Sequence, residues 1–140
     1  MSLTLTPSFA IDVEIAAPRE VGPVHGGRLR VIAITGGRVH GDDLNGVVLA
    51  GGADWNTMRT DGVVEVWARY EIETDDGHIL SVVNEGIGPV DRSAASGLVT
   101  RPRFTVPEAG PTWLTTSALV GHLRPSADGV TIDVYRVVES

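Results

Sequence analysis

The sequence predicts an all-β protein, a closed antiparallel up-and-down β-barrel of about eight strands. Apolar and polar residues alternate in runs along the whole chain, which is the period of a strand with one buried face. Glycine or proline stands in nearly every gap between these runs. No window of about ten residues has apolar positions at helical spacing between a cap and a stop signal. Closure is favoured because it removes unpaired strand edges, and an open sandwich is the alternative.

The strands are predicted from the amino terminus onward. The first contains four large apolar residues at every second position, namely Phe9, Ile11, Val13 and Ile15. Further strand-like runs cover residues 28–35, 44–49, 63–74, 78–85, 98–106, 112–122 and 130–138. Residues 86–97 form the longest irregular piece, and a loop of that length in a compact domain is more often functional than structural.

Length and composition limit the chemistry. At 140 residues the chain predicts a single domain, 1–140, which needs neither disulfides nor metal to fold. Cysteine is absent and all eleven basic residues are arginine, so the chain has no thiol nucleophile and no lysine for a Schiff base. The net charge of −7 and the scattered arginines argue against nucleic acid as a partner. The lack of a long apolar run or signal pattern predicts a cytoplasmic protein with no membrane partner.

One central segment has a specific order of residues. A Gly-Gly pair precedes a Trp beside an acid, and a long alternating strand then leads to an Asp-Gly turn. The pieces are Gly51-Gly52-Ala53-Asp54-Trp55, Arg59, Asp61-Gly62, Ala68-Arg69-Tyr70 and Thr74-Asp75-Asp76-Gly77. This order resembles the DUF3237 family, also called UPF0311, and the likeness covers nearly the whole chain. The resemblance implies a small barrel of the calycin or streptavidin type, and it implies no reaction because the family is named as uncharacterised.

The central hairpin predicts which side chains face the lumen. If Asp76 and Gly77 form a two-residue turn, Ala68 lies opposite Glu85. One face then holds mostly apolar residues and three polar ones, which is typical of a lumen that binds a small molecule. The three polar residues are Tyr70, Ser81 and Glu85. A three-residue turn would flip the second strand and remove Glu85 from that face.

Tyr70 and Glu85 are the predicted catalytic residues, and Ser81 is predicted to contact the ligand. A carboxyl in an apolar lumen has a raised pKa and can transfer protons near neutral pH, with the phenol orienting the substrate. The alternative is that Tyr70 packs in the core and Glu85 is an exposed strand end.

Asp54, Trp55 and Arg59 are predicted ligand-binding residues. Trp55 could stack on a planar ligand while Asp54 and Arg59 bind a polar substituent. Equally, Asp54 could cap the turn after the glycine pair, with Trp55 plugging one end of the barrel.

Four outer or flanking residues have predicted roles of other kinds. Arg101 and Arg103 alternate around Pro102 and could clamp a carboxylate of the ligand. Trp67 and Arg69 are predicted to face outward and to contribute to a homodimer interface. A surface ion pair is the ordinary alternative for Arg69.

The sequence predicts no cofactor and no metal. The glycine pairs lack the following helix that a nucleotide-binding loop requires. His40 with Asp42 and Asp43 is the only group that resembles a metal site, and it has no second histidine. No nucleophile elbow indicates a serine triad.

Three classes of function remain. The favoured one is a cofactor-independent isomerase, cyclase or lyase that acts on a small apolar or aromatic metabolite in the lumen. The alternatives are a non-catalytic binding barrel for a hydrophobic metabolite and a structural or assembly subunit.

Overall fold

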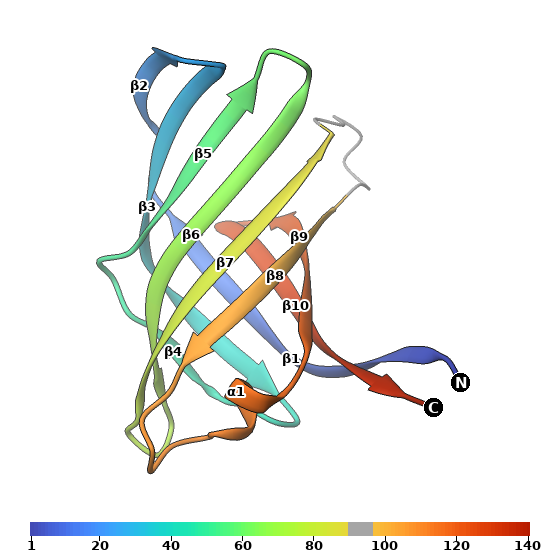
Figure 1. Ribbon diagram of the computed structural model, residues 1–140. Coiled ribbons are helices and arrows are strands. Elements are labelled where there is room, and N and C mark those ends of the chain that lie inside the picture. Colours follow the sequence, from blue (N-terminus) through green and yellow to red (C-terminus); the bar gives the residue numbers. More distant parts are fainter. Residues whose placement is uncertain (90–96) are drawn as a thin grey trace.

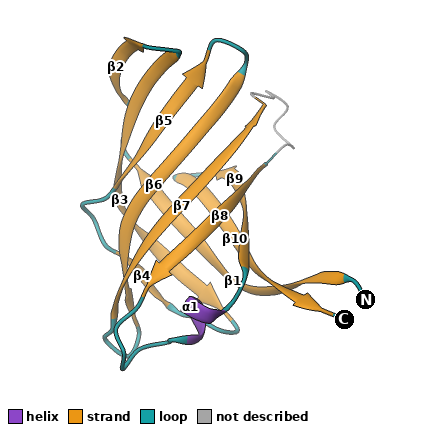
Figure 2. Cartoon of the chain, viewed as in Figure 1, coloured by secondary structure: helices purple, strands orange, loops and turns teal. Residues whose placement is uncertain are grey.

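The computed structural model describes residues 1–89 and 97–140. Ten strands and one short helix form a tall barrel (Figures 1 and 2). The elements are β1 (Leu3–Ile15), β2 (Arg19–Val24), β3 (Gly27–Gly41), β4 (Gly46–Val48), β5 (Ala53–Arg59), β6 (Val63–Thr74), β7 (Ile79–Pro89), β8 (Leu98–Thr105), α1 (Trp113–Thr116), β9 (Leu119–Ser126) and β10 (Gly129–Glu139). Within the described part of the chain, no helix has the length and apolar character of a membrane span.

The strands close into a ring in which every neighbouring pair is antiparallel. The order is β1, β10, β9, β8, β7, β6, then β4 and β5 side by side in one position, then β3, which pairs back to β1. The ring therefore has eight positions, and β2 extends it as a hairpin on β3. The predicted closed barrel is confirmed. The short helix α1 was not predicted, since residues 112–122 were expected to be all strand.

The hairpin between β6 and β7 has a three-residue turn. The backbone N–H of Thr74 donates to the carbonyl of His78, which leaves residues 75–77 as the loop. Gly77 has φ of 90°, a backbone conformation that favours glycine. The hydroxyl of Thr74 also accepts from the His78 N–H and donates to Asp76, so side-chain chemistry holds the longer turn.

This turn sets the register of β7. Ala68 pairs with Asn84, and Trp67 pairs with Glu85. The prediction that Glu85 faces the lumen is therefore wrong, because one extra loop residue exchanges the two faces of β7. The faces predicted for β6 are confirmed, with Tyr70 and Ile72 buried inside.

A cluster of buried apolar side chains lies toward the end of the barrel where α1 is found, the lower end in Figure 1. Phe9 packs edge-to-face on Phe104 and on Trp113, with ring centroids 6.0 and 6.4 Å apart. Ile72 and Leu80 are completely buried beside them. Figure 2 shows α1 lying across this end, where its Leu114 is buried. We call this region the closed end.

Candidate functional site

A cavity of about 440 Å³ occupies the barrel on the other side of this core. Met58, Pro89 and Pro125, from near the ends of three strands, contribute to its wall. Its size is within the range of small-molecule sites, which are about 300–1,000 Å³ and mostly apolar. Most of the lining is aliphatic, including Val13, Ile32 and Val66.

Five hydrophilic side chains line this cavity, and they come from four neighbouring strands. They are Arg30 of β3, Asp54 and Asn56 of β5, Tyr70 of β6 and Asn84 of β7. Asp54 pairs with Ala68, which in turn pairs with Asn84, so the acid and the amide lie in one row on either side of a small residue. Two strand spacings, about 10 Å, separate their backbones, and the short Ala68 side chain leaves room between them.

Burial raises the pKa of Asp54 above its ordinary value of 3.8. The effect is opposed by the backbone N–H of Trp67, which donates to Oδ1 of Asp54 at 3.1 Å, by Asn56 and by the charge of Arg30. Burial dominates because the carboxylate loses water that these groups do not replace. Asp54 is therefore a carboxyl whose proton affinity is increased, on the wall of a mostly apolar cavity.

Asn56 is a close neighbour of both Arg30 and Asp54. Nη2 of Arg30 donates to Oδ1 of Asn56 at 3.2 Å, and the nearby Asn56 side chain lowers the pKa of Asp54 against the larger effect of burial. The strand register explains this order. Arg30 lies directly opposite Asn56, and Asp54 is the preceding inward-facing residue of β5. The three side chains are thus held in order along two adjacent strands.

Three buried polar atoms of these cavity-lining residues have no hydrogen-bond partner among residues 1–89 and 97–140. They are Nε of Arg30, the hydroxyl of Tyr70 and Oδ1 of Asn84. Burial raises the pKa of Tyr70, so its phenol stays protonated and acts as an O–H donor. Buried polar groups are nearly always paired, which makes such a set typical of a site that a ligand completes.

The glycine pair before Asp54 has a steric reason. Gly51 has φ of 119°, and a side chain on Gly52 would place its first carbon 2.3 Å from the carbonyl oxygen of Arg69 and 2.5 Å from Cβ of Tyr70. Only glycine permits this close approach. The motif therefore brings the start of β5 against the strand that carries Tyr70.

Of the predicted site residues, Asp54 and Tyr70 line the cavity. Glu85 does not, and it pairs with Trp67 on one side and Arg101 on the other in the outward row of the wall. Ser81 also faces outward, between Glu71 and Thr105, for the same reason of register. Neither Glu85 nor Ser81 is therefore part of the cavity lining.

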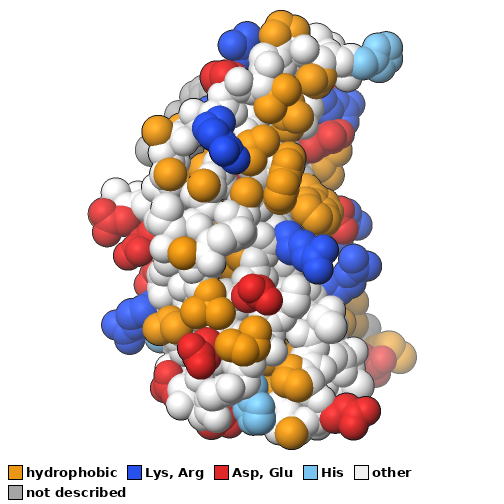
Figure 3. All heavy atoms as spheres, turned by 90° about the vertical axis from the view of Figure 1, so that its left-hand side faces the viewer, with side chains coloured by type: hydrophobic (Ala, Val, Ile, Leu, Met, Phe, Trp, Pro, Cys, Tyr) orange, Lys and Arg blue, Asp and Glu red, His pale blue; other side chains and the backbone are white. Residues whose placement is uncertain are grey.

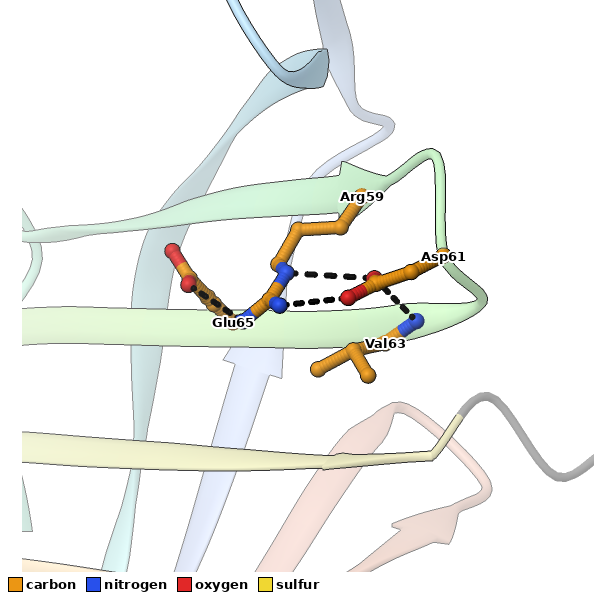
Figure 4. Close-up of polar contacts among 4 residues, drawn as sticks. All are labelled: Arg59, Asp61, Val63 and Glu65. Atoms are coloured by element: carbon orange, nitrogen blue, oxygen red, sulfur yellow. Dashed lines mark hydrogen bonds and ion pairs between the residues drawn. The ribbon is translucent and has the colours of Figure 1, made fainter.

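Trp55 and Arg59 alternate with Asp54 and so point away from the cavity. Trp55 is 42% exposed and packs edge-to-face on Trp67, with ring centroids 5.6 Å apart. Arg59 is held by two acids, with Nε 3.1 Å from Asp61 and Nη1 3.2 Å from Glu65 (Figure 4). Arg59 thus stabilises the turn between β5 and β6, and its guanidinium is paired with these two acids.

Arg101 and Arg103 share a face, as expected, but that face is the exposed outer wall. Arg69 is exposed there too. Figure 3 views the wall from the side of β3 and β5 and shows apolar side chains interspersed with charged ones. A two-fold interface at Trp67 and Arg69 stays a prediction.

Three lumen residues were not predicted as site residues, namely Arg30, Asn56 and Asn84. Asn56 could have been found from the sequence, because it stands two positions after Asp54 and shares its face. Asn84 required the correct turn length. Arg30 gave no signal, because an arginine in an alternating run is ordinarily read as solvent-exposed.

No group of three or more His, Cys, Asp or Glu side chains suited to a metal ion occurs within residues 1–89 and 97–140. His40 contacts Asp12, with Nε2 2.9 Å from Oδ2, and Thr131 donates to the other oxygen of Asp12 at 2.8 Å. These contacts lie on the outer wall and engage both carboxylate oxygens of Asp12 as acceptors.

Comparisons with known proteins agree with the fold. The family described as a protein of unknown function (DUF3237) matches residues 3–137. A UPF0311 protein of Rhodopseudomonas palustris is 36% identical over 143 residues, covering 93% of this chain and 94% of the relative. A UPF0311 protein of Bradyrhizobium diazoefficiens is 34% identical, with 93% of each chain covered.

Solved structures are similar over almost the full length. A conserved protein of unknown function from R. palustris has a TM-score of 0.88 at 35% identity, with 99% of each chain covered. A beta-barrel like protein from Acinetobacter baumannii has a TM-score of 0.86 at 25% identity, covering 99% of this chain and 98% of the other. An enzyme from Penicillium herquei has a TM-score of 0.74 at 19% identity, covering 98% and 94%, a likeness of fold alone. From its sequence and its barrel alike, the chain belongs to the DUF3237 (UPF0311) family.

Proposed function

We propose that this barrel is a cofactor-independent acid–base enzyme, an isomerase, cyclase or lyase, that acts on a small apolar or aromatic molecule in its cavity. The observation that carries the proposal is Asp54, a carboxyl whose pKa burial raises and which lines a mostly apolar cavity. A raised pKa brings the carboxyl closer to neutral pH, where it can both accept and return a proton. The aliphatic lining supplies a hydrophobic environment for the substrate.

The proposed roles follow from the hydrogen bonds. Oδ1 of Asp54 is oriented by the N–H of Trp67, which fixes the carboxyl on the lumen wall. The neutral phenol of Tyr70 has no hydrogen-bond partner among the described residues, and its proposed role is to donate its O–H to a substrate oxygen as negative charge develops there. Asp54 removes a proton from one atom of the substrate and returns it to another. Such a reaction balances without an oxidant, a reductant or a second substrate.

The test begins with a metabolite screen by thermal shift, which supplies a ligand. The ligand is then incubated with protein in D₂O, and mass spectrometry reads deuterium uptake or rearrangement. We expect Asp54→Asn to lower the rate by about 10²–10⁴-fold while the affinity stays within severalfold. Activity should survive exhaustive dialysis against a chelator.

Glu85→Gln is the matched control, because Glu85 is a carboxyl on the outward face of β7. It should turn over at the wild-type rate. An Asp54→Asn variant as fast as the wild type would exclude the catalytic role. Ligands that bind in the cavity without any exchange or conversion would instead support the non-catalytic binding barrel, which the same cavity favours.

A further inference from the structure

The guanidinium of Arg30 belongs to a cavity-lining residue and contacts no carboxylate of residues 1–89 and 97–140. Its one side-chain hydrogen bond among the described residues goes to the neutral amide of Asn56, and its Nε is buried without a partner. The ion pairs formed by the described residues do not include Arg30. The charge of Arg30 lowers the pKa of Asp54 against the larger effect of burial, but the two side chains form no ion pair.

A cation in this position favours a bound anion. Arginine cannot lose its proton in a protein, so it cannot relieve the cost of burial by becoming neutral. A nearby negative charge in a poorly solvated cavity is attracted several times more strongly than in water. The net charge of −7 does not cancel this attraction, because charges on the outer surface are screened beyond about 10 Å by salt.

Two further cavity-lining residues, on β6 and β7, carry buried polar atoms without a partner among the described residues. Oδ1 of Asn84 and the hydroxyl of Tyr70 come from β7 and β6, whereas Arg30 comes from β3. Asn84 can accept from a hydroxyl or N–H of a ligand, and Tyr70 can donate. Aliphatic residues such as Ile32 and Val66 line the same cavity.

We propose that the ligand of this cavity is an apolar monoanion. Its anionic oxygen, a carboxylate or an ionised enol or phenol, pairs with Arg30, its body lies against the aliphatic lining, and a polar substituent meets Asn84 and Tyr70. The inference deepens the proposed function by naming the substrate class. It rests on the cavity as the ligand site and does not require proton transfer by Asp54.

Three matched probes test the proposal by calorimetry at neutral pH. They are 2-naphthoate, its uncharged carboxamide, and a nitro-substituted naphthol that is ionised at this pH. We expect at least one anion to bind the wild type tenfold or more tightly than the carboxamide. A preference confined to naphthoate indicates a carboxylate ligand, and one confined to the naphthol indicates an enolate or phenolate.

Arg30→Met should abolish this preference, and Arg30→Lys, which keeps the charge, should retain it in large part. Arg28→Met is the matched control, because Arg28 is exposed and pairs with Glu20 at 3.1 Å. It should leave the preference unchanged. Should Arg30→Met fail to fold, Arg30→Gln takes its place with the same expectation.

Equal affinity of the anions and the carboxamide for the wild type would overturn the proposal. So would an anion preference that survives in Arg30→Met, or no binding of any probe. Asp54→Asn separates the two ideas. If it loses turnover yet still prefers anions, both stand, and if it keeps full turnover with the anion preference intact, only the acid–base role fails.

Discussion

The two ends of the barrel use the same strands to opposite effect. At the closed end, inward side chains such as Phe104 and Leu80 fill the lumen and exclude water. In the cavity, the inward positions of the same sheet carry polar side chains such as Asp54 and Asn84. The difference indicates that one end supplies most of the packing that stabilises the fold, while the other holds groups that cost stability and are available to a ligand.

The largest expected effect is on the stability of the closed end. Leu80 is completely buried, so Leu80→Ala should lower the free energy of unfolding by about 2–5 kcal/mol. Leu98→Ala removes the same atoms from the cavity wall, where empty space already exists. It should cost clearly less, as read by urea denaturation. Equal losses for both variants would break the contrast between the ends.

Tyr70→Phe should not destabilise the protein. The hydroxyl of Tyr70 is buried without a partner in the described part of the chain, and such a group costs about 1–3 kcal/mol. Removing it should therefore leave the free energy of unfolding unchanged or raise it, while the affinity for the cavity's ligand falls. A clear loss of stability in the same urea experiment would show that the hydroxyl has a partner in the protein.

Asp54→Asn should be more stable than the wild type at neutral pH, and this advantage should disappear at acidic pH. The pKa of Asp54 is raised by burial, so its contribution to stability is fully present below the unfolded value of 3.8 and is lost as pH rises through the folded value. The variant has an amide that does not ionise, so it does not lose stability in this way as pH rises. Its advantage should appear above about pH 4 and grow to a plateau in denaturation curves taken across pH.

Asp12→Asn is the control of opposite sign. Burial alone would raise the pKa of Asp12, but hydrogen bonds from Thr131 and His40 lower it overall. Its contribution is therefore present above 3.8 and lost as pH falls through the lower folded value. The variant should be less stable than the wild type at neutral pH, by less than about 1 kcal/mol because the site is largely exposed. The deficit should vanish in acid.

The last prediction concerns the outer wall. Trp67 is 39% exposed, so Trp67→Ser should lower the unfolding free energy less than Leu80→Ala does. If the wall forms the proposed two-fold interface, the variant should shift the mass from a dimer to the 14.8 kDa monomer in light scattering. A wild type that is monomeric at high concentration would count against the interface.

The sequence predicted the barrel and two of the five hydrophilic residues that line the cavity, for identifiable reasons. Period-2 alternation placed Tyr70 on the inner face of β6, and the glycine motif pointed to Asp54. The inner face of β7 could not be fixed, because it depends on whether the turn has two or three residues. The hydroxyl of Thr74, which supports the longer turn, is a local interaction that alternation does not report. Arg30 was missed because its burial depends on the closure of the ring around it.

The turn at residues 75–77 has a consequence for how such barrels diversify. It lies at the closed end, yet its length decides whether Asn84 or Glu85 reaches the cavity farther along β7. Deleting one residue there would exchange the two faces of β7 and so replace a neutral amide by a carboxylate in the lumen that contains Arg30. A single-codon deletion in a surface hairpin could therefore convert a lumen that attracts anions into one that repels them.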